Sequence, residues 1–406
     1  MKKHILNLWA LAAIFAVTSC TVEIREDADN NGGGTTQNPS TGAVLSGTGT
    51  LSGTLKQNTT VKKGNYTLEG VVKVPEGITL TIEPGATFTA KTSVSSSIVV
   101  LQGGKIFAEG TAAEPIVFTS DNKKPGDWGG LTIYGNAPIK AINGAAKALS
   151  EDGNNVYYGG DNPNDNSGIL KYVRVEYGGK KIGDGTSETN SLTFYSVGAG
   201  TTLENLVAYM GTDDGFEFFG GTVSAKNIVS YGNYDDSFDW QDAWSGQNNS
   251  SWYAYQTTIG NFGMEIEASG NADNTAPKIN GITLIREANT KPETAGSIEV
   301  SAIQFKKHGN GIFTDVYIDG YHDTDGKKAY AVLIQDAATE AEQVNKGKII
   351  VQPVNHLNSS NLNMWGYSYV PAVPKTFTSD AGVKKVTLTP GNWATVNGVD
   401  LLAKLK

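Results

Sequence analysis

Two pairs of acidic residues, 22 positions apart, are the side chains in this sequence best placed to do chemistry. Asp213-Asp214 is followed by Asp235-Asp236, and Glu217 is followed at the same spacing by Asp239. If the fold stacks each acid on its counterpart, carboxylates about 4.8 Å apart repel one another by roughly 3.5 kcal/mol at an effective dielectric near 20. Such a stack needs a bound cation, hydrogen bonds from backbone amides, or raised pKa values.

These acids allow three interpretations. A hard cation such as Ca²⁺ binds several carboxylate and carbonyl oxygens at once. Paired carboxylates also act as general acid and base in glycoside hydrolysis, and Asp214, Asp235 and Asp236 would carry out that reaction. Alternatively, aspartates before Gly215 and Ser237 are turn residues that bond to neighbouring amides. We expect cation binding rather than catalysis. The candidate metal ligands are Asp213, Asp214, Glu217, Asp235, Asp236 and Asp239.

A group of aromatic residues is the second candidate site, here for ligand binding. Flat aromatic faces suit sugar rings, because they combine a large apolar area with a polar edge. The candidates flank a polar insertion at 245–251 or lie within a longer one at about 141–168, and long loops often carry binding surfaces. The alternative is that they pack a loop against the fold. The ligand-binding candidates are Trp244, Trp252, Tyr253, Tyr157 and Tyr158.

An internal repeat predicts the elements that position these residues. Residues 204–220 match residues 226–242 at a constant offset of 22. That offset is typical of one coil of a parallel β-helix, in which each coil carries about three short strands. Like residues then stack on like at about 4.8 Å, which predicts aromatic ladders. The matched pairs include Val207 with Val229, Tyr209 with Tyr231, and Phe216 with Phe238.

The remaining sequence is all-β in character. Short β-branched runs such as 79–82, 97–101 and 115–118 alternate with turns rich in Gly, Asn, Asp and Pro, and long amphipathic helices are missing. These features predict a single parallel β-helix solenoid over residues 44–406, with loop insertions at about 141–168 and 245–251. We expect the last forty residues to cap its end, because an open end exposes unpaired strand edges.

Several segments resemble a known family. The segment LTIEPGATF (Leu80 to Phe88), the segment GGKIFAEGTAAEPIVFTS (Gly103 to Ser120) and the segment WGGLTIYGNAPI (Trp128 to Ile139) are similar to the right-handed parallel β-helix, pectin-lyase-like surface lipoproteins of Bacteroidota. DDGFEFFGG and IFTDVYIDGY continue the likeness. The resemblance implies a right-handed solenoid at the cell surface. It implies no particular activity, because members of that family largely lack an assigned one.

The acidic motif also resembles a second group. Thr212 to Gly215, followed by Asp235-Asp236, is similar to the acidic motifs of polygalacturonase-type β-helix hydrolases. Those enzymes carry a Gly-His-Gly motif about one coil later and an Arg-x-Lys motif beyond it. Here the corresponding place reads Gly260-Asn261-Phe262-Gly263, and the basic residues Arg286 and Lys291 have a different spacing. The groups that would orient the acids and bind uronate are therefore missing.

The first twenty residues predict export and lipidation. Two lysines precede an apolar stretch from Ile5 to Val17, which is the layout of a secretory signal and too short to span a membrane. The small residue before Cys20 resembles the lipobox of bacterial lipoproteins, and Cys20 is the single cysteine. We predict a signal peptide at 1–19, and a lipidated Cys20 that begins a disordered tether at 20–43. A plain signal peptide is the alternative.

Charge and location narrow the function. The net charge is -9 and Lys/Arg clusters are missing, which argues against nucleic acid as a partner. The leading hypothesis is a non-catalytic protein of the outer membrane, anchored by lipid and facing the exterior. It would bind an extracellular glycan or protein ligand as an accessory to an outer-membrane uptake complex. The alternatives are a polysaccharide-cleaving enzyme, either a polygalacturonase-like hydrolase or a lyase, and a structural or adhesive surface protein.

Overall fold

The computed structural model describes residues 42–182, 187–360, 365–367 and 379–406. The predicted signal peptide (1–19), Cys20 and nearly all of the tether (20–43) lie outside the described residues. Within the described ranges, no helix is long and apolar enough to cross a membrane. The first strand, β1 (Ala43–Thr54), begins where the tether was predicted to end.

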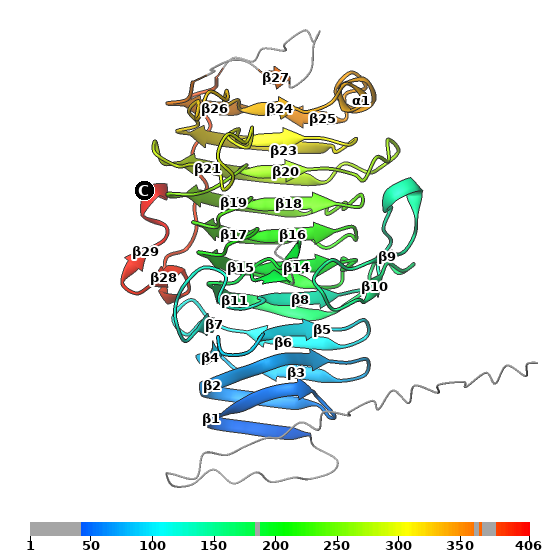
Figure 1. Cartoon of the computed structure of the whole chain (residues 1–406), viewed down its shortest axis with the longest axis vertical. Coiled ribbons are helices and arrows are strands. Elements are labelled where there is room, and N and C mark those ends of the chain that lie inside the picture. The colour runs from blue at the N-terminus through cyan, green and yellow to red at the C-terminus, as the bar shows by residue number, and fades with distance from the viewer. Residues whose placement is uncertain (1–41, 183–186, 361–364, 368–378) are drawn as a thin grey trace, which may run out of the picture.

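The chain winds into a right-handed parallel β-helix, which confirms the predicted fold class (Figure 1). Its coils stack into three columns of parallel strands, which we name A, B and C in the order in which a coil passes through them. Strand β2 (Thr59–Val74) runs through all three columns, and β1, which pairs with it from Ala43 to Thr54, does the same at the start of the solenoid. Columns A and B share six further strands: β11 (Gly168–Glu176), β15 (Thr202–Tyr209), β17 (Ala225–Tyr231), β19 (Asn249–Gln256), β21 (Lys278–Arg286) and β23 (Gly311–Asp319).

The remaining strands of the solenoid belong to one column each. Column A also contains β3 (Thr79–Ile82), β6 (Lys105–Glu109) and β25 (Ile349–Val351). Column B also contains β4 (Ala86–Ala90), β7 (Ile116–Ser120) and β26 (Val354–Leu357). Column C contains β5 (Ser97–Val100), β8 (Leu131–Tyr134), β14 (Leu192–Tyr195), β16 (Phe216–Phe219), β18 (Phe238–Gln241), β20 (Met264–Ile266), β22 (Ile303–Phe305), β24 (Val332–Ile334) and β27 (Trp365–Tyr367).

The 22-residue repeat corresponds to one coil, as the sequence predicted. Backbone pairing aligns Phe216 with Phe238 and Tyr209 with Tyr231. The ring centroids of these two pairs lie 5.7 and 5.6 Å apart. Both predicted aromatic ladders are therefore confirmed, one inside the solenoid and one on its outer surface.

The bend between columns A and B explains the asparagines of the repeat. In six consecutive coils one residue at this bend has a positive φ, a conformation that asparagine and glycine adopt more readily than other residues. Asn205 and Asn227 occupy the bend in neighbouring coils, and the Asn227 side-chain amide donates to Asn205 Oδ1 at 3.2 Å. The bend residues are Tyr172, Asn205, Asn227, Ser251, Gly281 and Asp315.

The described C-terminal segment (379–406) does not cap the solenoid end, which corrects that expectation. It runs back along the outer surface of column B, as Figure 1 shows in red. The Val386 N–H donates to Thr283 Oγ1 at 2.9 Å, and the Arg174 guanidinium donates to the Asn392 carbonyl at 2.7 Å. The physical reason is that outward residues of column B, such as Val207 and Val229, are apolar and require cover. The segment contains η3 (Asn392–Ala394), β28 (Thr395–Val396), β29 (Val399–Asp400) and η4 (Ala403–Leu405).

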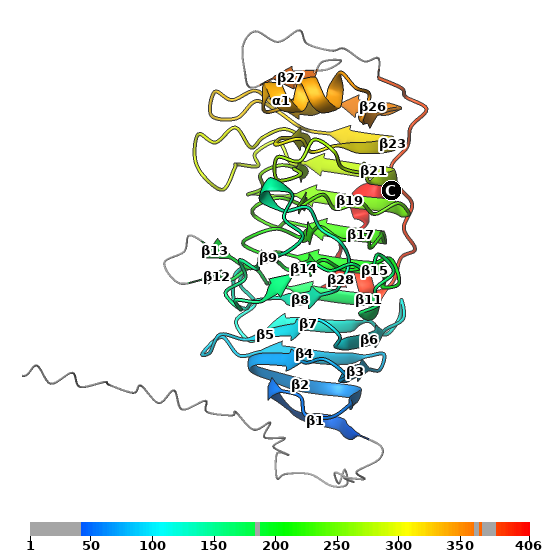
Figure 2. The ribbon, with the colours of Figure 1, turned by 90° about the vertical axis from the view of Figure 1, so that its right-hand side faces the viewer.

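The long insertion at 141–168 packs against column C, projects at the right in Figure 1 and faces the viewer in Figure 2. The long insertion at 141–168 folds back as the hairpin of β9 (Ala148–Leu149) and β10 (Tyr157–Tyr158). The insertion predicted at 245–251 is shorter, because β19 already begins at Asn249. The other elements outside the columns are η1 (Ile142–Gly144), β12 (Lys181–Ile182), β13 (Ser187–Glu188), α1 (Ala337–Thr339) and η2 (Glu340–Val344).

Candidate functional site

The six predicted acids lie together where the chain enters strands β16 and β18 of column C. With Glu265 of β20 they form three groups, in each of which one oxygen of every member lies within 4.8 Å of the others. We call these groups the carboxylate triads. Because Asp214 and Asp239 each belong to two triads, the cluster is continuous across neighbouring coils. The triads are Asp213 with Asp214 and Asp235, Asp214 with Glu217 and Asp239, and Asp236 with Asp239 and Glu265.

Asp214 and Asp236 form a hydrogen-bonded ladder between coils. Asp214 Oδ1 accepts the backbone N–H of Asp236 at 2.9 Å, and Asp236 Oδ1 accepts that of Phe262 at 2.6 Å. One coil earlier, Asn190 Oδ1 accepts the backbone N–H of Asp214 at 3.3 Å. Each side chain therefore satisfies a backbone donor of the next coil, which would otherwise be buried without a partner. These two aspartates are part of the framework of the solenoid.

A row of carboxylates also follows the outer surface of the column C strands. Backbone pairing aligns Glu217 with Asp239, and Asp239 with Glu265. Glu217 points away from the core, but its side chain is buried. The side-chain amides of Asn190 and Gln241 donate to its two oxygens. We call Glu217, Asp239 and Glu265 the carboxylate row.

Asp239, in the middle of this row, has an oxygen without a donor. Its buried Oδ1 atom accepts no hydrogen bond from the described residues. Gln304 pairs with Glu265 and continues the row. It is 1% exposed, and its buried Oε1 atom likewise accepts no hydrogen bond from the described residues. A buried acceptor left without a donor costs about 1–3 kcal/mol. A hard cation coordinated by oxygen atoms is one ligand that would supply the missing interaction.

Burial raises the pKa of the acids in this cluster. The pKa values of Asp214, Glu217, Asp236 and Asp239 lie well above the ordinary range, because burial disfavours the charged form and neighbouring carboxylates add repulsion. Burial also raises the pKa of Asp235 to about 7, although a hydrogen bond from Asn261 acts in the opposite direction. At neutral pH the cluster therefore either keeps protons or requires a counter-charge.

Lys306 supplies such a counter-charge at one end of the row. Its side chain is 18% exposed and forms ion pairs with Glu265 and, at 3.6 Å, with Glu267. Lys307 adds an ion pair to Glu267 at 2.7 Å. In the described part of the chain, no lysine or arginine forms an ion pair with Asp214, Glu217 or Asp239, the acids of the middle triad. The described ion pairs of the cluster therefore lie at its Glu265 end.

Glu265, Glu267 and Lys306 belong to this site but were not predicted from the sequence. Phe238 pairs with Met264, which follows it by 26 residues, so a search at a fixed spacing of 22 passes over this coil. The available signal was the pattern of Met264-Glu265-Ile266. It repeats the inward, outward, inward order of Phe238-Asp239-Trp240.

The segment that stands where the hydrolases carry histidine holds the aspartates in place. The Asn261 side-chain amide donates to Asp235 Oδ1. Arg286 is buried and its guanidinium donates to the Asn261 carbonyl at 2.6 Å and to Gln256 Oε1 at 3.0 Å. Lys291 is exposed and pairs with Asp325 at 3.5 Å. Arg286 is thus enclosed by the fold, although its Nη2 atom has no hydrogen-bond partner among the described residues, and Lys291 is engaged with Asp325.

Two loops flank the aspartates and meet each other. The loop that follows β21 is bound to the turn between β19 and β20, since the Glu293 N–H donates to Asn261 Oδ1 at 2.8 Å. On the other side, the Thr212 N–H donates to the Gly178 carbonyl at 3.2 Å, directly before the β12–β13 hairpin. An ion pair of 3.5 Å between Lys181 and Glu293 joins the two loops. The acids are therefore bordered on both sides by surface segments.

The structure contradicts the exposure that ligand binding would require of three aromatic candidates. Trp244, Trp252 and Tyr253 are 1%, 0% and 0% exposed. Trp252 pairs with Ile228, an inward position, and Trp244 stacks inside the solenoid on Phe218 at 4.6 Å. Tyr253 faces outward but lies under the C-terminal segment. These residues pack the fold, which was the alternative considered for them.

The two tyrosines of the long insertion differ from each other. Tyr158 is buried, and its hydroxyl donates to Asp242, so it fastens the insertion to column C. Tyr157 is 66% exposed. Of the five aromatic candidates, Tyr157 is thus the one whose ring is open to a ligand.

A parallel β-helix with these features is a pectate-lyase-like solenoid. The chain belongs to the family described as pectate-lyase like β-helix domain, whose model matches residues 53–393. Among solved structures it is similar to the Dettilon tailspike protein, with 10% identity and a TM-score of 0.24. That similarity covers 74% of this chain and 62% of the tailspike chain. No curated protein matches the sequence. The fold alone does not define an activity, which has to be argued from the site.

Proposed function

We propose that this protein is a non-catalytic binding protein that holds an extracellular glycan at a bacterial cell surface. The observation that carries the proposal is the ladder through Asp214 and Asp236. An oxygen of each acid is engaged by the backbone of the next coil, whereas a general acid or base must reach the substrate. Asn261, which occupies the place of a histidine, holds Asp235 and cannot itself transfer protons in this way.

The location is proposed from the start of the sequence. Residues 1–19 act as the signal peptide, Cys20 carries the lipid, and the tether to residue 43 separates the solenoid from the outer membrane. The acids at 23–29 resemble the signal that sends Bacteroidota lipoproteins to the outer face. A protein in this position would serve an uptake complex of the same membrane by retaining its nutrient nearby.

We also propose that the carboxylate triads bind Ca²⁺. In each of the two triads that contain Asp239, the three carboxylates lie close enough to share one cation. Asp239 Oδ1 is also buried without a hydrogen-bond donor. Oxygen ligands in a site of high negative charge favour a hard divalent cation. In this role the cation stabilises the solenoid beneath the flanking loops.

The central experiment compares binding with cleavage. The purified protein is tested on an array of polysaccharide fragments, and every bound fragment is then incubated with the protein and assayed for new reducing ends or unsaturated sugars. The proposal expects retention without cleavage. Release of products that disappears in Asp235→Asn, or in the double variant Asp214→Asn/Asp236→Asn, would instead establish an enzyme.

Polysaccharide cleavage remains the second candidate because of Asp235. Its pKa of about 7 is suited to proton transfer near neutral pH. Asp235 and Asp239 are also only partly buried, unlike Asp214 and Asp236. A reaction through these two groups would lose its activity in Asp235→Asn while binding of the substrate persists.

A further inference from the structure

The three outer faces of the solenoid are covered to different degrees. The C-terminal segment lies on column B, and the long insertion at 141–168 packs mainly over column C. Column A instead presents polar side chains outward, in rows that run from coil to coil. One row contains Lys171, Glu204 and Lys226, which backbone pairing aligns in consecutive coils. A face with this composition requires no cover for its own stability and is open to a ligand.

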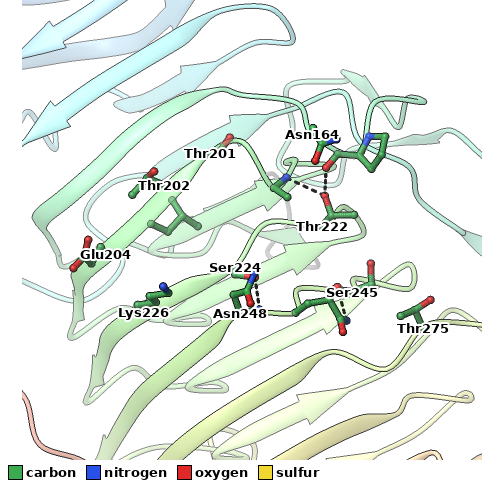
Figure 3. A pocket seen from close by; sticks show the side chains of 14 residues that line it. Asn164, Thr201, Thr202, Glu204, Thr222, Ser224, Lys226, Ser245, Asn248 and Thr275 are labelled. Atoms are coloured by element: carbon green, nitrogen blue, oxygen red, sulfur yellow. Dashed lines mark hydrogen bonds between the residues drawn. The ribbon is translucent and has the colours of Figure 1, made fainter.

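A groove crosses this face at the corner where column C passes into column A. It has a volume of ≈ 440 Å³ and is lined by residues from the turns of five consecutive coils (Figure 3). Neighbouring coils lie about 4.8 Å apart, so the groove extends roughly 19 Å along the solenoid axis. The labelled polar residues around it are Asn164, Thr201, Thr202, Glu204, Thr222, Ser224, Lys226, Ser245, Asn248 and Thr275.

Part of this lining is already used by the fold and part is free. The Thr222 hydroxyl bonds to the Pro163 carbonyl, and Ser224 Oγ accepts the Asn248 N–H at 3.0 Å. Within the described part of the chain, the side chains of Thr202 and Asn248 make no hydrogen bond, and both are exposed. The groove therefore offers an unused hydroxyl on Thr202 and an unused amide on Asn248, on two coils that have one other coil between them.

The charges in the groove nearly balance. Glu204 forms an ion pair with Lys171 at 3.4 Å, and Lys226 lies beside it in the next coil. None of the exposed large apolar side chains of the described residues lines the groove. A protein partner usually needs apolar or aromatic anchors, whereas a sugar chain needs hydroxyl and amide partners along its length.

We infer that this groove binds a neutral, linear oligosaccharide that lies along the solenoid axis. The inference rests on the proposed glycan-binding function and deepens it by naming the place and the class of ligand. Successive sugar rings would cross the coils, with Thr202 and Asn248 bonding to ring hydroxyls. The groove is separate from the carboxylate cluster, whose residues do not line it.

The test uses two groove variants and a matched control. Thr202→Ala/Asn248→Ala removes the two free partners, and Thr202→Trp fills the groove with a bulky side chain. The control is Thr60→Ala/Thr81→Ala, because pairing through Phe107 and Ile169 places these threonines in the same outward row as Thr202, on coils below the groove. Melting curves verify that all variants fold.

Each protein is screened against xylan, mannan and galactan oligosaccharides and against polygalacturonate, and binders are titrated by calorimetry. We expect a neutral oligosaccharide to bind, its Kd to rise about tenfold in the double alanine variant, and Thr202→Trp to abolish binding while the control is unchanged. A neutral glycan whose Kd is the same in all variants would show that the groove is not the binding site and would leave the proposed function intact. Binding to polygalacturonate alone would overturn the neutral ligand. Binding to no glycan would overturn the proposed function together with the groove.

Discussion

Asp214 Oδ1 accepts the backbone N–H of Asp236 at 2.9 Å, so one coil of the solenoid fastens the next through a side chain. Asn190 performs the same task for Asp214 one coil earlier. Because asparagine does this without a charge, the ladder requires an acceptor oxygen at this position but not a carboxylate. The ladder therefore does not explain why positions 214 and 236 carry carboxylic acids rather than amides, and the proposed cation gives the carboxylic acids a role.

Substitutions of Asp214 separate these two roles. In the presence of a chelator, Asp214→Ala should lower the free energy of unfolding by about 1–3 kcal/mol, because it leaves a buried backbone N–H without an acceptor. Asp214→Asn should retain the hydrogen bond and relieve repulsion, so its stability should equal or exceed that of the unmodified protein. Denaturant titration measures both. Equal losses in the two variants would show that the charge itself stabilises the metal-free fold.

Trp244 and Tyr157 test the corrected view of the aromatic residues. Trp244→Ala should cost about 3–5 kcal/mol, because it empties a large space in the core. Tyr157→Ala should change stability by no more than about 0.5 kcal/mol, because its ring is exposed. Thermal melting provides the comparison, and glycan titration of the Tyr157 variant shows whether that ring also contacts ligand. A stable Trp244→Ala protein that has lost only ligand binding would restore the original interpretation.

Cys20→Ser tests the membrane anchor. Without the thiol the chain cannot be acylated, and the solenoid offers no described helix to replace the lipid. The variant should therefore move from the membrane pellet to the soluble fraction after cell lysis, with Thr21→Ser as a control that keeps the cysteine. Unchanged membrane association of Cys20→Ser would show that another attachment exists.

The sequence predicted most of the fold and the core of the site because two neighbouring coils have equal length. The turns before and after β16 and β17 match those of the next coil, so a constant spacing exposed Asp214 and Asp236 as counterparts. The following coil is longer, because the turn at 242–248 exceeds the one at 220–224 and the turn at 257–263 exceeds the one at 232–237. Glu265 consequently fell out of the repeat although it occupies the same outward position.

Burial of the aromatic residues could not be read from local sequence for a different reason. Tyr253 has an outward position in its strand, and its cover comes from residues more than a hundred positions later, including Trp393 and Leu402. Trp252 is inward because β17 and β19 pair with a spacing of 24. The alternation of residues near the polar loop predicts neither the cover over Tyr253 nor the pairing register of Trp252, because both depend on residues far away in the sequence.

The raised pKa of Asp235 links the stability of the fold to pH. The carboxyl has an ordinary pKa of 3.8 in the unfolded chain and a pKa of about 7 in the folded protein. Between these values the folded state binds more protons than the unfolded state, so the free energy of unfolding falls as pH rises from about 4 to about 7. Above that range the loss is complete, and below it this group contributes no pH dependence. The other buried acids of the cluster, with raised pKa values, act in the same direction.

Calcium should oppose this loss, because it replaces the protons that the carboxylates release. In a chelator, the melting temperature should decrease as pH rises. Added Ca²⁺ should raise it by at least roughly 2–4 °C at neutral pH and leave it unchanged near pH 4, since a ligand bound only by the folded state stabilises it.

Asp239→Asn, which removes a charge shared by two triads, should abolish most of the calcium effect, whereas Glu109→Gln, at an exposed position outside the cluster, should not. A melting temperature that rises with pH in the chelator would contradict the raised pKa values. A calcium effect of equal size in Asp239→Asn would place the cation elsewhere, and the absence of any effect would leave the aspartates as elements of the coil-to-coil ladder alone.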